Sequence, residues 1–386
     1  MNGKRSDIGN LYPFVKAYSD SNKQAYSYLN DAWTDLDEWR NAARERALRC
    51  LLYEPDDAPL DPVVLETIRA DGYRREEIEF SSGRDVRVRG TLLIPENGKR
   101  THPAIVALHD HGGFYYYGRE KLIDIDDEPV LLREFKQMLY SGKSWATDRV
   151  KQGYVVLVID AFYFGSRKLD MASVSEEMFG WVTQRSLDGL EPGTDAYIRR
   201  CNEICNDFET LMIKKLLTAG TSWAGVLSYD DRKSVDYLAT RAEVDPDRIA
   251  CCGLSIGGFR SALLAGTDPR IKASVVTGWM PTLDSLLFNR LRNHTFMIYI
   301  PGLARDMDLP DLLSLTCPNP LFVQQCMQDP LYTMEGMQAA CDKLKAVYEK
   351  AGAAENFRSE FYDNGHEFNI RMQEDAFAWL DRQLKP

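Results

Sequence analysis

The stretch Gly253-Leu254-Ser255-Ile256-Gly257-Gly258 follows the apolar run at residues 249–252 and opens a segment of small and apolar residues. Glycines on both sides leave room for close backbone packing, so this spacing is typical of a strained turn from a strand into a helix that pushes the serine hydroxyl outward. The pattern alone is weak, and its context decides. Here a strand-like run precedes it and helix-like residues follow, which favours Ser255 as a nucleophile over a serine in a structural turn.

The histidines are the candidate bases, because a serine hydroxyl needs a neighbouring group to take its proton. The chain has five, at positions 102, 109, 111, 294 and 366. His366 lies in the polar segment 363–368, between the last strand-like run and the closing helix, from where a side chain can reach the carboxyl edge of a sheet. His294 lies in an irregular segment with no strand end to fix it. We expect His366 to be the base; the alternative is a loop histidine without a role.

An acid from another strand end should hold the base in the correct tautomer. Residues 320–330 indicate a strand and a short loop that carries one carboxylate, Asp329. Asp363 is only three residues from His366, but an acid from the same loop would orient the ring less rigidly. The expected triad is therefore Ser255, Asp329 and His366, with Asp363 as the alternative acid.

The negative charge that develops on a carbonyl oxygen needs preorganised N–H donors. One normally comes from the residue after the nucleophile, which is Ile256, and another from the loop after an early strand. That loop is Leu108-His109-Asp110-His111-Gly112-Gly113. Counting from the strand end favours the His111 amide, whereas the His-Gly-Gly motif favours Gly112 or Gly113. Metal binding by residues 109–111 is the other interpretation, but adjacent residues of an extended segment point in alternating directions.

Short apolar runs that alternate with helix-like segments predict an α/β fold with a mostly parallel sheet, flanked by helices. An antiparallel hairpin is expected first, at residues 75–80 and 86–94, with a turn at residues 82–84. The expected parallel strands are at residues 104–108, 154–159, 249–252, 273–276, 321–323 and 357–362. The expected helices are at residues 130–151, 223–240, 261–265 and 334–350.

The first 74 residues form the expected helical N-terminal extension, and residues 75–386 the catalytic body. From residue 26 to residue 50, apolar residues recur every three or four positions, with Thr34 and Asp37 placed as a capping pair. The extension is expected to pack on the body; a homodimer contact through these helices is the alternative. Two insertions, 168–221 and 289–315, are expected to cap the site, and ordinary surface packing is their alternative.

Composition narrows the class of protein. The 386 residues carry 47 Lys and Arg against 58 Asp and Glu, a net charge of −11, which argues against a nucleic-acid or anionic membrane partner. The start is polar and no run is long enough to span a bilayer, so we expect a soluble, cytoplasmic protein. The eight cysteines show no CxxC spacing, and buried free thiols are expected in preference to disulfides or a metal site.

These residues, in this order, resemble the α/β-hydrolase superfamily, and most closely its dienelactone-hydrolase and acetyl-xylan-esterase-like branch. The resemblance begins at about residue 75 and rests on segments 109–113, 160–167, 244–249 and 365–366. It implies a serine hydrolase that works through an acyl-enzyme, with small acyl groups such as acetyl on a sugar-like alcohol as substrates. Asp110 stands where many relatives have Gly. Dienelactone hydrolases use a cysteine nucleophile, so their substrate does not carry over to a chain with Ser255.

The hypothesis is a carboxylic-ester hydrolase that needs neither a metal nor an organic cofactor. Aromatic and apolar residues near the expected site are candidates for its substrate pocket: Trp279, Met280, Phe114 and Tyr115. The nearest alternative is a serine peptidase or amidase like the prolyl oligopeptidases, but residues 1–74 are too few and too helical for the propeller that those enzymes carry. A non-catalytic sensor or scaffold with the hydrolase fold is the other alternative.

Overall fold

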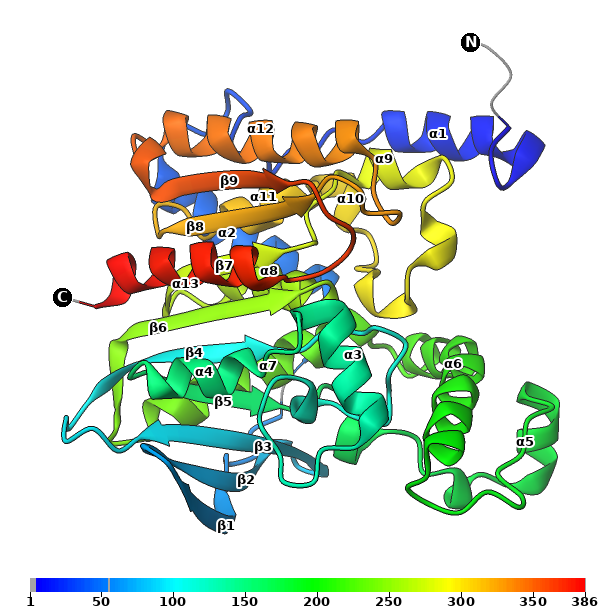
Figure 1. Ribbon diagram of the computed structural model, residues 1–386. Coiled ribbons are helices and arrows are strands. Elements are labelled where there is room, and N and C mark those ends of the chain that lie inside the picture. The colour runs from blue at the N-terminus through cyan, green and yellow to red at the C-terminus, as the bar shows by residue number, and fades with distance from the viewer. Residues whose placement is uncertain (1–4, 55, 386) are drawn as a thin grey trace.

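A nine-stranded sheet runs through the middle of the protein (Figure 1). The computed structural model describes residues 5–54 and 56–385, and in this part of the chain the strand order is β1-β2-β3-β5-β4-β6-β7-β8-β9. The strands are β1 (Val63–Ala70), β2 (Tyr73–Gly83), β3 (Val86–Pro95), β4 (His102–Leu108), β5 (Val155–Ile159), β6 (Val244–Leu254), β7 (Ile271–Thr277), β8 (Leu321–Cys326) and β9 (Phe357–Tyr362).

Pairing divides this sheet into two parts. The strands β1, β2, β3 and β5 pair antiparallel, and from β5 through β4, β6, β7 and β8 to β9 every pairing is parallel. The expected hairpin and all six expected parallel strands are confirmed, and so is the α/β class. The carboxyl ends of the parallel strands lie at one edge of the sheet, the right-hand edge in Figure 1.

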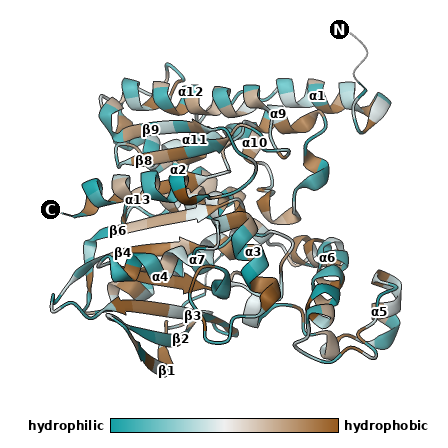
Figure 2. Ribbon diagram, in the orientation of Figure 1, coloured by the Kyte–Doolittle hydropathy of each residue, from teal (hydrophilic) through white to brown (hydrophobic). Residues whose placement is uncertain are grey.

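Helices cover both faces of the sheet, because the central strands are apolar on both sides. In β4, Ile105 and Ala107 pack into one hydrophobic core, and Val106 and Leu108 into the other. The strands β4 and β5 are strongly hydrophobic in Figure 2. The first core also holds α3 (Val130–Tyr140), α4 (Trp145–Lys151) and α13 (Ile370–Leu384); the second holds α2 (Leu36–Cys50), α7 (Trp223–Ala239), α8 (Ile256–Thr267), α11 (Leu309–Ser314) and α12 (Met334–Lys350).

The N-terminal helix differs from the expected one in where it starts. Helix α2 begins at Leu36, with the Asp35 carboxylate accepting the Glu38 N–H at 2.8 Å, so the expected capping pair Thr34 and Asp37 is wrong. Residues 26–35 form turns instead, and the Trp39 indole N–H donates to the Tyr26 carbonyl at 2.8 Å. The buried face of α2 packs in the core, which confirms packing on the body. The homodimer contact stays a prediction.

Strand β1 lies inside the stretch 1–74 that was expected to be helical. It pairs antiparallel with β2 as an exposed edge strand. Its signal is present in Val63, Val64, Thr67 and Ile68, since β-branched residues favour strands. The sheet therefore begins before residue 75. The helices of the extension are α1 (Tyr12–Asp20) and α2, which ends at Cys50.

Two expected helices differ in length from those in the structure. The segment 130–151 is interrupted between α3 and α4, where Ser141 and Gly142 have positive φ angles of 54° and 75°. Helix α8 begins at Ile256, immediately after the nucleophile candidate, rather than at Ser261.

The first insertion lies beyond the carboxyl edge of the sheet, whereas the second runs from that edge to α11, which packs in the core. The first contains α5 (Glu176–Val182) and the long α6 (Asp195–Thr218), both on the right in Figure 1. The second contains α10 (Leu303–Asp306) and α11, preceded by short 3₁₀ turns. All eight cysteines are buried and free. Among the described residues, no helix combines the length and apolar character needed to cross a membrane.

A buried ion pair joins α8 to α7. The Arg260 guanidinium donates to both carboxylate oxygens of Asp231, at 3.0 and 2.6 Å, and the side chains are 1% and 0% exposed. Because α8 starts directly after Ser255, this pair helps to fix the helix on which the nucleophile turn rests.

Replacing Asp231 by Asn is expected to lower the free energy of unfolding by about 3 kcal/mol, because it leaves a buried guanidinium without its countercharge. Urea denaturation measures this. Glu45→Gln is the matched control: it breaks the exposed Arg49–Glu45 pair on α2 and should cost less than about 1 kcal/mol. Equal midpoints for the two variants would contradict the role given to the buried pair.

Candidate active site

Ser255 occupies a strained turn between β6 and α8. Its φ and ψ are 61° and −120°, a conformation that a residue with a side chain rarely adopts. A Cβ atom on Gly253 would lie 2.4 Å from the Leu108 carbonyl oxygen, and one on Gly257 would lie 2.0 Å from it, so only glycine fits at either position. The Ser255 N–H donates to the Thr277 carbonyl at 2.9 Å. The turn is thereby fixed, with the serine side chain half-buried.

His366 and Asp329 meet at the ends of two neighbouring strands. His366 Nδ1 lies 2.5 Å from Asp329 Oδ2, and the Asp329 side chain is buried. The other carboxylate oxygen accepts the Leu331 N–H at 2.9 Å. Asp329 is therefore held on both oxygens. Asp363 is exposed and accepts a hydrogen bond from Gln328 at 2.8 Å, so the alternative acid is not at the histidine.

Ser255, Ile256 and His366 line one cavity of about 410 Å³, together with His111 and Gly112 from the loop after β4. The structure thus brings together all three expected triad residues and the expected oxyanion residues. Within residues 5–54 and 56–385, no hydrogen bond joins the Ser255 hydroxyl to His366. Catalytic hydrogen bonds often tighten only when substrate is bound.

Three residues of the loop after β4 line this cavity, His111, Gly112 and Gly113. The His111 ring accepts the Gly113 N–H on Nδ1 at 3.0 Å, so that amide already has a partner. In the described part of the chain, neither the His111 N–H nor the Gly112 N–H donates a hydrogen bond. Of the three expected second donors, His111 and Gly112 remain available.

The neighbouring histidine and aspartate have structural partners of their own. His109 Nε2 accepts the Ala161 N–H at 3.1 Å, and Asp110 Oδ1 accepts the Tyr140 hydroxyl at 2.5 Å. Burial, with a contribution from nearby Lys121, holds the pKa of His109 well below its ordinary value. His109, Asp110 and His111 thus point to three different sets of partners. No cluster of three or more metal-ligating side chains occurs among the residues that the structure describes.

Glu209 is the main site residue that sequence reasoning missed. It lies on α6 in the first insertion, lines the cavity and accepts hydrogen bonds from Tyr115 at 2.8 Å and Thr295 at 2.9 Å. His111 Nε2 lies 3.0 Å from it. Burial acts to raise the pKa of Glu209, but the hydrogen bonds from His111, Tyr115 and Thr295 outweigh it and hold the pKa below its ordinary value. The carboxylate is therefore ionised.

A signal for Glu209 exists in the sequence. Cys201, Cys205 and Glu209 recur at four-residue spacing, so the glutamate continues the buried stripe of α6. A carboxylate on an apolar stripe needs a polar partner.

The expected pocket residues fall in different places. Trp279 lines the cavity. Met280 does not; it is buried behind the cavity, where its carbonyl accepts the Gln325 amide at 2.8 Å. Phe114 lines a separate cavity of about 270 Å³ that also borders Gly112 and Gly113. Tyr115 is fully buried and contributes through its hydroxyl to Glu209 rather than as a wall.

His294, which the sequence argument set aside, does line the cavity. Its Nε2 lies 3.3 Å from the Leu331 carbonyl oxygen, and its ring packs against Trp279 and Tyr332. Burial lowers its pKa, which favours the neutral ring. His294 therefore forms part of the cavity wall, and its partner Leu331 lies 37 residues later in the chain.

The chain is similar to a curated hydrolase and, in its fold, to solved esterase structures. The Bacillus subtilis (strain 168) protein YtaP, assigned as a hydrolase, is 26% identical over 362 residues, covering 89% of this chain and 100% of that protein. A Bacteroides fragilis NCTC 9343 protein assigned as an acetyl xylan esterase superposes with a TM-score of 0.69 at 19% identity, covering 92% of this chain and 84% of that one. A glucuronoyl esterase from Solibacter usitatus superposes with a TM-score of 0.63 at 13% identity, covering 93% and 97%.

These likenesses to solved structures establish the fold, and they include the acetyl xylan esterases of the expected branch. The model of the Abhydrolase family matches residues 2–181 and 178–383, which is nearly the whole chain. The protein therefore belongs to the Abhydrolase family and is a hydrolase with the α/β-hydrolase fold.

Proposed function

We propose that this protein is a serine hydrolase of carboxylic esters that works through an acyl-enzyme. The observation that carries the proposal is the 2.5 Å contact between His366 and the buried Asp329, in a cavity that also holds Ser255 on its strained turn. A nucleophile, a base and an orienting acid from three separate strand ends are the set that this chemistry requires.

The contacts assign the proton positions. A carboxylate can only accept, so Nδ1 of His366 carries the ring proton towards Asp329 and Nε2 is left as the base. Nε2 takes the proton of the Ser255 hydroxyl as its oxygen attacks the ester carbonyl. The same proton then goes to the leaving alcohol. Water, deprotonated by Nε2, releases the acid from the acyl-enzyme and restores the serine. These steps need neither a metal nor an organic cofactor.

The oxyanion of each tetrahedral intermediate needs N–H donors within hydrogen-bond distance of its oxygen. The Ile256 N–H begins α8, where the first backbone amides of a helix have no partner within the helix. His111 and Gly112, which carry the other two candidate amides, line the same cavity. We assign the oxyanion to Ile256 with these two.

The cavity wall supports a small acyl group on a sugar-like alcohol. Its volume suits a small molecule, and its lining mixes polar with aromatic and apolar side chains; the polar ones include Asn206, Glu209, Arg292, Asn293 and Thr295, and the apolar ones include Trp279, Ile298, Leu331 and Tyr332. The hydroxyl groups of a sugar can hydrogen-bond to the polar side chains, and the C–H faces of its ring can pack on the apolar ones. The names of the structural neighbours, acetyl xylan and glucuronoyl esterases, also point to carbohydrate esters.

Ser255→Ala and His366→Asn should each reduce turnover of 4-nitrophenyl acetate by at least about 10⁴-fold, because each removes one member of the nucleophile and base pair. His294→Asn is the matched control: it removes another histidine that lines the cavity, whose ring nitrogen lies near the Leu331 carbonyl rather than Asp329, and should cost less than about tenfold. Labelling by a fluorophosphonate should be lost in Ser255→Ala, strongly slowed in His366→Asn, because the serine is then not activated, and kept in His294→Asn. Full turnover by that variant would disprove the mechanism.

A substrate panel should separate an esterase from a peptidase or a binding protein. We expect 4-nitrophenyl acetate and acetylated xylose to be hydrolysed, with kcat/KM falling by about tenfold or more for octanoate, because the cavity is small. Aminoacyl 4-nitroanilides should give no product. Amide turnover with no ester turnover would favour the peptidase, and an unlabelled, inactive protein would favour the sensor or scaffold.

Glu209 should select against anionic acyl groups. Glu209→Gln keeps the shape of the side chain and removes its charge, so hydrolysis of a 4-nitrophenyl hemisuccinate relative to the acetate should rise by about tenfold. Asp207→Asn is the matched control, since that carboxylate lies on the same helix and bonds to Thr183 at 2.6 Å outside the cavity. An unchanged ratio in Glu209→Gln would remove the carboxylate from substrate selection.

A further inference from the structure

A buried lysine lies directly behind the loop that follows β4. Lys121 is 0% exposed, and its Nζ donates to the carbonyl oxygens of Asp110 at 2.9 Å and His111 at 3.1 Å. The carboxylate oxygen Oδ2 of Asp110 lies 3.6 Å away as its countercharge. Nothing in the proposed triad uses this lysine.

The two carbonyls belong to the peptide groups that carry the candidate oxyanion donors. The Asp110 carbonyl shares a planar trans peptide with the His111 N–H, and the His111 carbonyl shares one with the Gly112 N–H. In such a peptide the C=O and N–H bonds point in opposite directions. Because both carbonyls face Lys121, both N–H bonds point away from it, and the residues that carry them line the catalytic cavity.

Further donors fix the same carbonyls. His109 Nδ1 lies 2.8 Å from the Asp110 oxygen, and because its Nε2 already accepts the Ala161 N–H, Nδ1 carries the proton and donates. The His111 oxygen also accepts the Phe114 N–H at 3.1 Å. These contacts hold the loop, and among them only Lys121 brings a formal charge.

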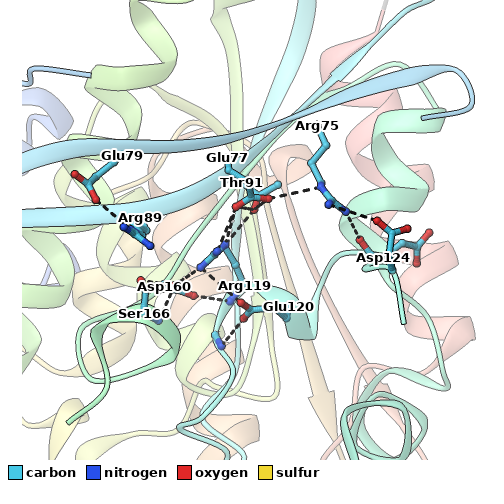
Figure 3. Close-up of polar contacts among 12 residues, drawn as sticks. Arg75, Glu77, Glu79, Arg89, Thr91, Arg119, Glu120, Asp124, Asp160 and Ser166 are labelled. Atoms are coloured by element: carbon cyan, nitrogen blue, oxygen red, sulfur yellow. Dashed lines mark hydrogen bonds and ion pairs between the residues drawn. The ribbon is translucent and has the colours of Figure 1, made fainter. Parts of the chain in front are cut away.

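The turn that carries Lys121 is itself anchored. Arg119, two residues earlier in the 3₁₀ turn Arg119–Lys121, lies between Glu77 of β2 and Asp160 at the end of β5 (Figure 3). Asp160 also accepts the Arg119 N–H at 2.9 Å and the Ser166 hydroxyl at 2.7 Å. The ammonium itself lies 4.8 Å from the centre of the Phe164 ring.

The geometry points to Lys121 as a positioning residue of the oxyanion hole, an inference that rests on the proposed ester hydrolysis. Its ammonium holds the carbonyls of Asp110 and His111 and polarises their peptide groups, so that the two N–H bonds are preorganised towards the charge that develops on the substrate oxygen. Asp110 serves here as the countercharge that lets the lysine remain charged in the interior.

Burial lowers the pKa of Lys121 to about 8, and Asp110, Glu120 and Asp160 oppose that shift. The charged and titratable groups around it are His109, Asp110, His111, Arg119, Glu120, Tyr140 and Asp160. Burial keeps His109 and Tyr140 neutral, by lowering the pKa of the first and raising that of the second. A lysine is charged at a pH well below its pKa, so the polarisation is present at lower pH and is lost as the pH rises through about 8.

The test compares kcat and KM for 4-nitrophenyl acetate across the pH range in the full-length enzyme and its variants. The wild-type kcat should decline as the pH rises through about 8. Lys121→Met should lower kcat roughly tenfold at neutral pH, change KM by less than about threefold, and lack this decline, because it loses the charge that the decline reports.

Lys136→Met is the matched control. Lys136 is another buried lysine, bonded to the Ile123 carbonyl at 2.7 Å and the Ser144 hydroxyl at 2.9 Å, but it does not contact the oxyanion loop. It should lose stability in a thermal unfolding assay and keep the wild-type pH profile. Equal loss of kcat in the two lysine variants would show a structural role alone and overturn the inference.

Asp110→Asn tests the same inference even if Lys121→Met does not fold. Loss of the carboxylate charge removes what stabilises the ammonium, so the decline in kcat should move to lower pH by about one unit. A decline that stays in place overturns the inference. Fluorophosphonate labelling of Ser255 separates this failure from failure of the proposed function. If the wild type is labelled and active, and the Lys121 variant keeps the wild-type kcat and pH profile, only the role of Lys121 is disproved.

Discussion

Backbone crowding at the end of β4 is the constraint on which the rest of the site depends. The Leu108 carbonyl oxygen lies so close to the turn after β6 that a Cβ atom on Gly257 would come within 2.0 Å of it. Leu108 begins the loop with the His111 and Gly112 amides, and Gly257 lies two residues after Ser255. The two parts of the proposed machinery are therefore in direct backbone contact. A larger residue at either glycine would separate the serine from its oxyanion donors.

Around this contact the protein pairs four buried carboxylates with a cation or a histidine ring. Asp329 meets His366, Asp231 meets Arg260, Asp160 meets Arg119 and Asp110 meets Lys121. Each such group would be costly to bury alone, and its partner both offsets that cost and fixes its direction. Preorganised dipoles and charges in a dry interior are the means by which hydrolases stabilise a developing anion. The same arrangement makes the geometry sensitive to the removal of a single partner.

Much of this fold follows from sequence alone. The strands β4 to β9 and the hairpin β2–β3 were predictable, because short apolar runs and turn residues have local signatures. Ser255, Asp329 and His366 could be chosen because each follows a strand-like run, and the ends of parallel strands meet at one edge of a sheet. The spacing of apolar residues gave a wrong prediction where the same spacing fits two different structures. The apolar spacing over residues 26–35 belongs to turns that place aromatic side chains on the body, and β1 was hidden in the stretch expected to be helical.

The sequence by itself determined the class of fold, the nucleophile turn and the order of the expected triad, since these depend on spacing along the chain. Tertiary structure alone decided which groups surround them. Glu209 contacts His111 across 98 residues of sequence, and Lys121 contacts the loop carbonyls from a turn that Arg119 links to Glu77 of β2 and to Asp160. Which amide faces the cavity, and which carboxylate faces which histidine, depends on how the helices and loops approach the sheet edge. No local sequence pattern predicts how these segments approach the sheet edge, because the energy of a buried contact depends on the partner that the fold places beside it.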